Sequence, residues 1–362
     1  MTTLIHSRDR KAISREAGAL RTWWHDRTEI LKVALVYGGL SAEDRLYIAE
    51  CPPGQRSVTA LAESLTELGV AFQILDPCDP GFIRDLLTFD IALSNLHGPY
   101  GEDGRLQGLL DYLRRPYCGS GVAASAIAAS KILCKLSMQG LGVPTPAWQT
   151  WTPGAAPQWE GRPVMVKPAL GGSSIGISLV RGEAAMAPAL EHAWAADPAP
   201  VLVEEYITGL SVTVGLLQLP GGLLIFPPVA AEVHDAEFYD AAAKLDARAQ
   251  GTVSLAKAGL PAEVADSLTR HARTLWDGLG CRSAARVDFM VRSDGTVHGL
   301  EVNTTPGMQR ESNFVTGAAL CGLSHTDVVL AFLHEALTRP AYDVPLPGPV
   351  LSASASVRET AA

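Results

Sequence analysis

The chain has 362 residues, of which 47% are hydrophobic and 19% are charged, an ordinary composition for a folded protein. This length exceeds what one hydrophobic core usually covers, so two or three domains are expected. The 29 Lys and Arg against 38 Asp and Glu give a net charge of −9 without any basic block, which argues against a nucleic-acid-binding protein. The six cysteines are scattered without a CxxC pair, so neither a disulfide framework nor a zinc site is expected.

Residues 1–30 form an N-terminal extension in which charges interrupt the apolar residues every few positions. This is the pattern of neither a signal peptide nor a membrane anchor. Elsewhere in the chain, no apolar stretch approaches the ~20 residues that a membrane span requires. We therefore expect a cytoplasmic protein without a membrane contact.

Residues 31–129 alternate between strand and helix patterns. The strands are expected at "LKVALVYGG", "AFQILD" and "DIALSNLHG", and the helices at "SVTALAESLTELGV" and "GRLQGLLDYLRR". This alternation predicts an N-terminal α/β domain with a parallel sheet and a ligand site at the C-terminal ends of its strands. Residues 122–142 are expected to form one helix that stops at a glycine.

The pattern becomes β-rich from residue 130 onward. "VMVKP", "GISLV", "VLVEEYI" and "LSVTVGLLQL" predict antiparallel strands joined by turns or a single helix. "ARVDFMV" and "TVHGLEVN" predict a hairpin whose turn contains Asp294 and Gly295. We divide this part into a central subdomain at 130–207 and a C-terminal subdomain at 208–340. The Pro-rich and then Ala/Ser-rich residues 341–362 are expected to form a flexible tail.

A glycine-rich loop in "VMVKPALGGSSIGISLV" separates two of these strands. Without side chains, successive glycine N–H groups form a concave site for an anion, and Lys167 at the end of the first strand adds a charge suited to phosphate. The order differs from that of a P-loop, because here the lysine precedes the glycines. The alternative is a mobile hairpin that binds nothing.

The hairpin "ARVDFMVRSDGTVHGLEVNTTPGM" carries a second candidate site. Glu301 and Asn303 lie two residues apart and so share one face, and Asp288 on the other strand can face them. Three oxygen ligands with open positions suit Mg²⁺. Arg286 shares the face of Asp288, where its charge is ready for an oxyanion or a phosphate. The alternative is an ordinary salt-bridged hairpin.

Together these motifs resemble the ATP-grasp ligases, and within them the D-alanine–D-alanine ligase family. The resemblance extends from about Lys32 to Leu337, and "GGLSAE", "HGPYGEDGRLQG", "GSGVAASAIAASK", "VMVKPALGGSSIG", "ARVDFMV" and "LEVNTTPGM" occur in the order of the family. It implies an ATP-grasp fold, in which an N-terminal parallel-sheet α/β domain and two α+β domains enclose the nucleotide. It also implies ATP and two Mg²⁺ ions, with Mn²⁺ as a substitute, amino-acid substrates and a homodimer.

The resemblance implies roles for individual residues around the nucleotide. The phosphates would be held by Lys131, Lys167 and Lys244, with Ser173 and Ser174 in a flexible loop above them and Ser173 close to the chemistry. Glu204 would accept a hydrogen bond from the adenine amino group, and the backbone of Glu205, Tyr206 and Ile207 would complete the purine clamp.

It implies a second set of roles at the reacting groups. Asp288, Glu301 and Asn303 would bind the two Mg²⁺ ions, and Arg286 with the Gly307 N–H would stabilise the tetrahedral intermediate. Glu43 and His97 would contact the first amino acid, Glu43 through its ammonium group. For His97 a capping or core position is the alternative.

Four positions depart from the family pattern. The segment after Glu43 is about six residues longer, Leu245 replaces a loop tyrosine, Ser211 replaces the ribose-binding glutamate, and Arg310 adds a cation. The acceptor contact falls on Ser312 and Asn313. The resemblance implies an ATP-dependent ligase that joins two amino acids, or an amino acid and an amine, through an acyl phosphate. The departures predict that its specificity is altered and that it has a role in specialised-metabolite or dipeptide biosynthesis. The alternatives are an authentic D-alanine–D-alanine ligase of peptidoglycan synthesis, a non-catalytic nucleotide-binding protein, and a kinase that stops at the acyl phosphate.

Overall fold

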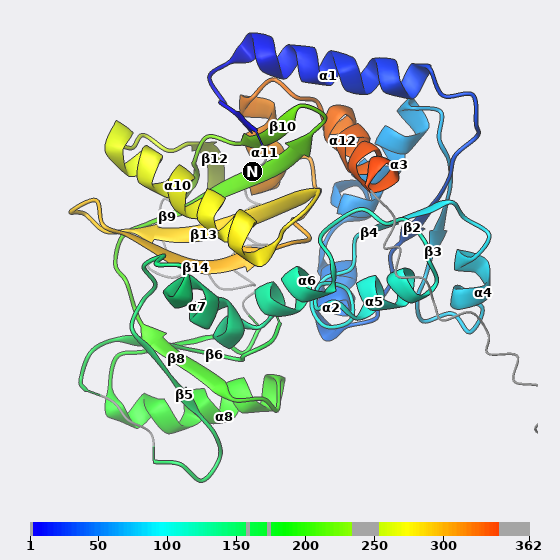
Figure 1. Cartoon of the computed structure of the whole chain (residues 1–362). Helices are drawn as coiled ribbons and strands as arrows, with labels where there is room; N and C mark the ends of the chain where they lie inside the picture. The colour runs from blue at the N-terminus through cyan, green and yellow to red at the C-terminus, as the bar shows by residue number, and fades with distance from the viewer. Residues whose placement is uncertain (1–2, 157–159, 172–174, 234–252, 340–362) are drawn as a thin grey trace, which may run out of the picture.

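The computed structural model describes the chain apart from residues 1–2, 157–159, 172–174, 234–252 and 340–362. The predicted tail at 341–362 lies outside the described residues, and so do four predicted site residues: Ser173, Ser174, Lys244 and Leu245. The described part of the chain is built around three sheets, of three, four and seven strands (Figure 1).

The three-stranded sheet is parallel, as the alternation of strands and helices predicts. Its order is β3 (Ala71–Leu75), β2 (Lys32–Val36) and β4 (Ile91–Ser94). Alternate residues of β2 enter two different cores: Val33 and Leu35 pack with α3, whereas Ala34 and Val36 pack with α4 and α5. Both faces of the sheet are therefore covered, which explains the unbroken apolar run of β2. The helices of this part are α2 (Ala42–Glu50), η1 (Pro53–Gln55), α3 (Ser57–Glu67), α4 (Phe82–Leu86) and α5 (Arg105–Tyr112).

The predicted single helix over 122–142 is wrong, because the chain forms two helices there. α6 (Val122–Ala129) and α7 (Lys131–Gly140) are separated at Ser130, which has extended backbone angles and whose side chain accepts from the Leu133 N–H. The Lys131 N–H donates instead to the Ala169 carbonyl, at 2.9 Å. This tertiary contact ends the first helix and places Lys131 at the start of the second.

The four-stranded sheet is antiparallel, as predicted, with α8 on one face. Its order is β5 (Trp148–Trp151), β8 (Val201–Glu205), β6 (Val164–Lys167) and β7 (Ser178–Val180). Its small core joins Val166, Val180 and Val203 to α8 (Met186–Ala196), which follows η2 (Glu183–Ala185). In Figure 1, α7 lies between this sheet and the larger one.

The seven-stranded sheet carries the predicted hairpin, formed by β13 (Ala284–Val291) and β14 (Val297–Asn303). β13 also pairs along its full length with β9 (Leu210–Leu219), so the hairpin is fixed in the sheet rather than exposed as an isolated ribbon. The other strands are β10 (Gly222–Ile225), β11 (Val229–Val233) and β12 (Val253–Lys257). The helices are α10 (Ala262–Leu279), α11 (Asn313–Leu320) and α12 (His325–Thr338).

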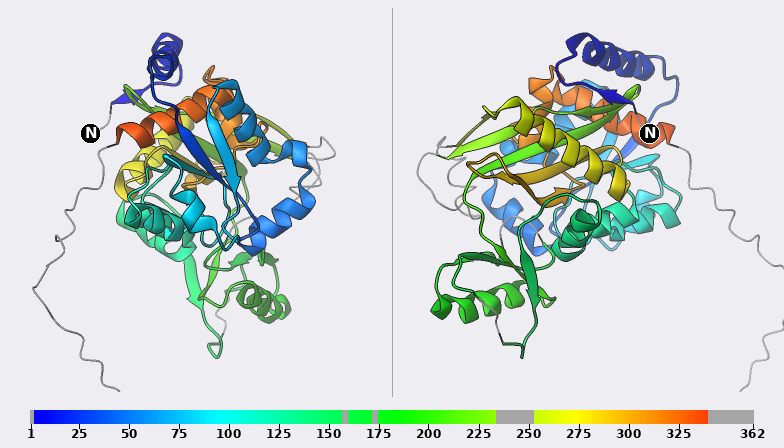
Figure 2. Two further views of the ribbon diagram at one scale, coloured as in Figure 1. Left: turned by 90° about the vertical axis from the view of Figure 1, so that its right-hand side faces the viewer. Right: turned by 60° about the vertical axis from the view of Figure 1, so that its left-hand side comes forward.

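The N-terminal extension adds a strand to the seven-stranded sheet and a helix that packs on the core beside it. β1 (Leu4–Ile5) pairs in parallel with β10, and α1 (Arg10–His25) packs against α12. The buried face of α1, with Ile13, Ala17 and Leu20, belongs to the same core cluster as α3, α12 and β2. Figure 2 shows α1 at one end of the molecule and the four-stranded sheet with α8 at the opposite end.

None of the described helices has both the length and the apolar character to cross a bilayer on its own. α11 and α12 taken together are long and apolar enough by length and composition, but the two helices are bent by 100° relative to each other.

Candidate active site

Four predicted residues meet on one face of the β13–β14 hairpin. Asp288 lies opposite Glu301, and Arg286 lies opposite Asn303. The Arg286 guanidinium grips the Asp288 carboxylate, with Nε 3.1 Å from Oδ1 and Nη2 2.9 Å from Oδ2, and its Nη2 is 4.0 Å from Glu301 Oε1. The hairpin therefore presents two carboxylates with a cation between them.

The two carboxylates on this face stabilise the positive charge of Arg286. Burial acts to lower the pKa of Arg286, but the charges of Asp288 and Glu301 outweigh that effect, and the pKa rises above its usual range. Asp288 is also oriented by the Thr213 hydroxyl, which donates to its Oδ1 at 2.8 Å and accepts from the Asn313 amide at 3.1 Å. Asn313, expected at the acceptor pocket, thus supports a predicted metal ligand through Thr213.

The donor set of the hairpin is compatible with a hard cation. Among the described residues there is no cluster of three or more His, Cys, Asp or Glu side chains that could hold a metal. The predicted set has two carboxylates and the amide oxygen of Asn303, which accepts from the Thr305 N–H at 2.8 Å and keeps a second lone pair. Oxygen-only donors that leave positions for other ligands suit Mg²⁺, so these residues fit the ion that the resemblance implies.

The hairpin face opens into a pocket that other predicted residues also line. Lys131 is buried in its wall and donates from Nζ to the carbonyl of Gly171, the first described glycine of the glycine-rich loop. Gly171 has φ of +89°, a left-handed conformation that favours glycine. The pocket thus lies between the hairpin, the start of α7, the glycine-rich loop and the segment that joins β4 to α5. Its lining includes Gly98, Glu102, Asp103, Lys131, Gly171, Glu301 and Asn303.

Lys167 and Glu204 form an ion pair between the ends of β6 and β8, and Lys167 precedes the glycine-rich loop in the chain. The Glu204 carboxylate is 1% exposed and also lies 2.6 Å from Nζ of Lys135, a residue that the sequence analysis did not select. The carboxylate is thus enclosed by two lysines. The adenine contact of Glu204 and the phosphate contact of Lys167 remain predictions.

The remaining predicted nucleotide residues follow Glu204 along the chain. Glu205 accepts from Arg292 at 2.6 Å, and the Arg181 guanidinium lies 5.7 Å from the Tyr206 ring centroid. Ile207 is buried, whereas Ser211, at the start of β9, is exposed. Arg292 was missed because its link to Glu205 joins segments 87 residues apart.

The first-substrate residues lie beside α2. Glu43 is in this helix, and its side chain lies outside the described part of the structure. The His97 N–H donates to Asp44 at 2.7 Å, and its ring meets the Tyr47 ring edge-on at 5.4 Å and Glu102 Oε1 at 3.4 Å. Burial raises the pKa of Asp44. His97 therefore lies partly buried in a loop at the C-terminal end of the parallel sheet, where a ligand site was expected.

The turn that contains Gly307 is held by groups that the sequence analysis missed. The Met308 N–H donates to the Ser57 hydroxyl at 3.1 Å, and His325 Nε2 lies 2.9 Å from the Met308 carbonyl. Ser312 caps α11 and donates to the Gly307 carbonyl at 2.6 Å. His325, on α12, therefore helps to hold the turn in place. Arg310 points to Glu63, 2.6 Å away, and both side chains are more than half exposed.

Comparisons with known proteins agree with this architecture. Residues 138–334 match the sequence model of the family described as D-ala D-ala ligase C-terminus. The D-alanine–D-alanine ligase of Syntrophotalea carbinolica is 37% identical over 319 residues, covering 85% of this chain and 97% of the relative. That of Halorhodospira halophila is 38% identical over 315 residues, covering 86% and 98%.

Solved structures give the same result. The crystal structure of the Bacillus anthracis D-alanine–D-alanine ligase complexed with ATP superposes with a TM-score of 0.70 at 26% identity, over 85% of this chain and 97% of that one. D-alanyl-alanine synthetase A of Vibrio cholerae, at 22% identity, shares the fold with a TM-score of 0.72 over 86% and 100%. The chain therefore belongs to the D-alanine–D-alanine ligase family and has the ATP-grasp fold of that family.

Proposed function

We propose that the protein joins two molecules of D-alanine at the expense of ATP, releasing ADP and phosphate. The observation that carries this proposal is the shared pocket: the Glu301 and Asn303 face of the hairpin, Lys131 and the start of the glycine-rich loop line one cavity. The identity of 37–38% to D-alanine–D-alanine ligases over nearly their whole length supports D-alanine as the substrate.

The reaction divides into two steps at this pocket. The carboxylate of the first D-alanine attacks the γ-phosphate of ATP, which gives an acyl phosphate and ADP; the amine of the second D-alanine then attacks the activated carbonyl, and phosphate leaves. Lys131 and Lys167 would bind the nucleotide phosphates as point charges. Asp288, Glu301 and Asn303 would hold Mg²⁺, or Mn²⁺ in its place, which neutralises phosphate charge when bound.

Arg286 would stabilise the negative charge that develops in the second step. Its guanidinium is positioned before substrate arrives, because Asp288 and Glu301 hold it from the same face. A fixed cation in a partly buried site stabilises a developing oxyanion without reorganising during the reaction. The Gly307 N–H would assist from the turn that Ser57 and His325 anchor. Glu43 and His97 would contact the first D-alanine.

The assay that tests the proposal follows phosphate release with ATP, Mg²⁺ and D-alanine, and identifies the product by mass spectrometry. We expect D-alanyl-D-alanine and ADP in equal amounts, with L-alanine as the matched control that gives little turnover. ADP without dipeptide would instead indicate a kinase that stops at the acyl phosphate. Nucleotide binding without ADP under any mixture of amino acids would indicate a non-catalytic protein.

A ligase with altered amino-acid specificity is the second candidate, and it rests on Leu245, Arg310 and the longer segment after Glu43. The ion pair between Arg310 and Glu63 weakens this candidate. The added cation is already paired with a carboxylate, at an exposed position. Under the D-alanine proposal, Arg310→Ala is expected to change the KM for the second D-alanine by less than about twofold, since Arg310 is exposed, pairs with Glu63 and is not among the residues that line the pocket. A tenfold increase, or faster turnover with another acceptor amine, would favour altered specificity. Glu63→Ala is the matched control.

Two further properties belong to the same proposal. A cytoplasmic location follows from the substrates, because ATP and free amino acids are supplied there. We also propose a homodimer, to be tested by light scattering on the purified protein.

A further inference from the structure

Lys135 is a fully buried lysine next to the proposed nucleotide site. It lies one helical turn after Lys131 on α7, and its side chain is 1% exposed. Lysine is almost never buried to this degree unless it is paired, because removing an ammonium group from water is strongly unfavourable. Its partners therefore indicate why it is there.

Those partners connect two subdomains. Nζ lies 2.6 Å from Glu204 Oε2 on β8 and donates to the Thr145 hydroxyl at 2.8 Å. Thr145 in turn donates to the Gly299 carbonyl at 2.9 Å, on the strand that carries Glu301. Lys135 thus connects Glu204, at the end of β8, to β14, which carries Glu301 and Asn303 of the predicted metal ligands.

The two lysines on Glu204 are not equivalent. Lys167 contacts the other carboxylate oxygen, but its side chain is 15% exposed and it lies at the end of β6, directly before the glycine-rich loop. Lys135 has 1% exposure and sits within packed helix and sheet. Of the two, Lys167 is the one placed to move toward a nucleotide phosphate.

The charges of this cluster make the two lysines interdependent. Burial acts to raise the pKa of Glu204, but Lys167 and Lys135 together outweigh it and lower that pKa, so the carboxylate is anionic. Burial likewise lowers the pKa of Lys135, and the Glu204 charge opposes this effect. A buried carboxylate that loses its last cation is strongly destabilised. Lys167 can therefore leave Glu204 at low cost only while Lys135 stays.

We propose that Lys135 is a positioning residue for the nucleoside triphosphate: it remains as the counter-ion of Glu204 and thereby releases Lys167 to bind phosphate. This inference rests on the proposed function, because it takes ATP as the ligand. Lys135 touches neither substrate nor metal in this scheme and acts entirely through Glu204 and Lys167.

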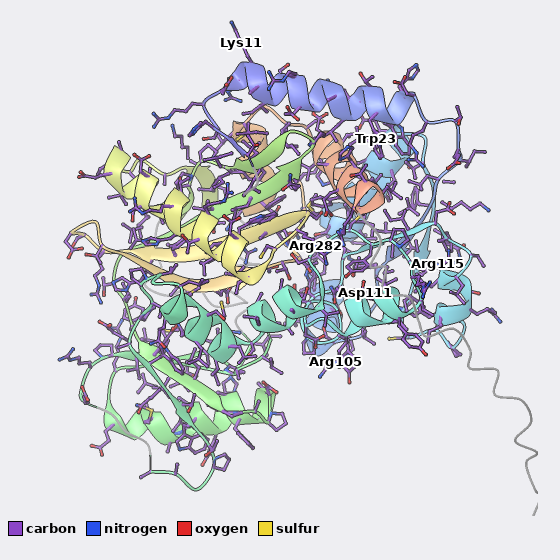
Figure 3. The ribbon with its side chains drawn as sticks, in the orientation of Figure 1. Lys11, Trp23, Arg105, Asp111, Arg115 and Arg282 are labelled. Carbon is purple, nitrogen blue, oxygen red and sulfur yellow. The ribbon has the colours of Figure 1, made fainter. Side chains whose placement is uncertain are left out.

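The test measures binding of the magnesium complex of a non-hydrolysable ATP analogue by titration calorimetry, together with KM for ATP and for D-alanine. Lys135→Met is expected to raise the Kd of the analogue and the KM for ATP at least about tenfold, with the KM for D-alanine changed less than twofold. Lys11→Met is the matched control, because Lys11 points away from the molecule on α1 (Figure 3). Lys11→Met should leave the Kd of the analogue and both KM values unchanged.

A double variant separates this role from a merely structural one. The double variant Lys135→Met with Glu204→Gln removes the buried carboxylate charge together with its counter-ion. Lys167 then has no carboxylate at position 204 to hold it away from the phosphates. We expect its Kd for the analogue to lie within about threefold of that of Glu204→Gln alone. This comparison also serves if Lys135→Met alone fails to fold, because the double variant contains no unpaired buried carboxylate.

The outcomes distinguish this inference from the function on which it rests. Wild-type protein that does not bind the analogue overturns the proposed function and the inference with it. Wild-type protein that binds, while Lys135→Met binds equally well, overturns the inference alone. A double variant that binds more than tenfold more weakly than Glu204→Gln does the same, since Lys135 would then act independently of Glu204.

Discussion

Replacement of Arg286 by methionine is expected to lower kcat about 10²- to 10³-fold, which is the usual cost of removing one fixed donor from an oxyanion site. Methionine is similar in length, so the packing of β13 is largely kept while the charge is lost. Binding of the non-hydrolysable ATP analogue should change less than about threefold, because Arg286 is assigned to the second step. Steady-state phosphate release and calorimetry measure the two quantities.

The magnesium dependence of this variant gives a second signature. In the structure the Arg286 guanidinium forms an ion pair with the Asp288 carboxylate and lies near the Glu301 carboxylate. Its replacement removes a cation that competes with Mg²⁺ for both carboxylates, so the Mg²⁺ concentration for half-maximal activity should stay equal or fall. Arg84→Met, which removes an exposed ion pair with Asp85 on α4, is the control and should retain full activity. A kcat above one tenth of wild type in Arg286→Met would contradict the assignment.

Arg286→Lys should recover little of this loss. The guanidinium contacts both oxygens of Asp288 and approaches Glu301 because it has several donors in a fixed plane. A lysine ammonium is a single point charge on a flexible stem and cannot keep both contacts. Recovery of wild-type kcat by lysine would mean that charge alone, without orientation, is sufficient.

The hairpin that carries Arg286 was predictable from sequence because its determinants are local. Alternation with period two defines the faces of both strands, and the Asp294–Gly295 turn sets which residues oppose each other. A register shift lies between Asp288 and Phe289, yet it leaves Asp288 opposite Glu301. The grouping of these side chains on one face therefore agrees with the prediction, whereas their role as metal ligands stays a prediction.

The break between α6 and α7 was not predictable in the same way. "VAASAIAASK" has strong helical propensity throughout, and nothing in it signals a stop at Ser130. The interruption depends on the Lys131 N–H donating to Ala169, which lies 38 residues further along the chain. Tertiary contact here overrides local preference, and the result places Lys131 at the pocket.

Lys135 escaped the sequence analysis for a related reason. One lysine in an amphipathic helix normally lies on the solvated face, and only the fold brings Glu204 and Thr145 to it. The same holds for Ser57 and His325, which reach the Gly307 turn from α3 and α12. The residues that are predicted to touch ligands lie in recognisable motifs, whereas the residues that hold them in place through tertiary contacts do not.

Leu20→Ala is expected to lower the free energy of unfolding by about 2–5 kcal/mol, the usual cost of truncating a buried leucine. Leu20 is completely buried on α1, in one core cluster with residues of α3 and α12. The extension would thus contribute to stability as core rather than as an appendage. Urea denaturation measures the change, and Ala19→Ser, at an exposed position of the same helix, is the control with less than about 1 kcal/mol.

The loss of stability in Leu20→Ala should also affect the active site, because both α1 and the turn that contains Gly307 contact α12. Arg21 binds Asp327 of α12 with contacts of 2.9 and 2.8 Å, and Asp327 caps the same helix end at which His325 reaches the Met308 carbonyl. At urea concentrations below global unfolding, we therefore expect Leu20→Ala to lose ligase activity before it loses helical circular dichroism, whereas wild type should lose both together. Coincident loss in the variant would show that α1 stabilises the protein without coupling to the turn. A destabilisation below 1 kcal/mol would show that α1 is not part of the core.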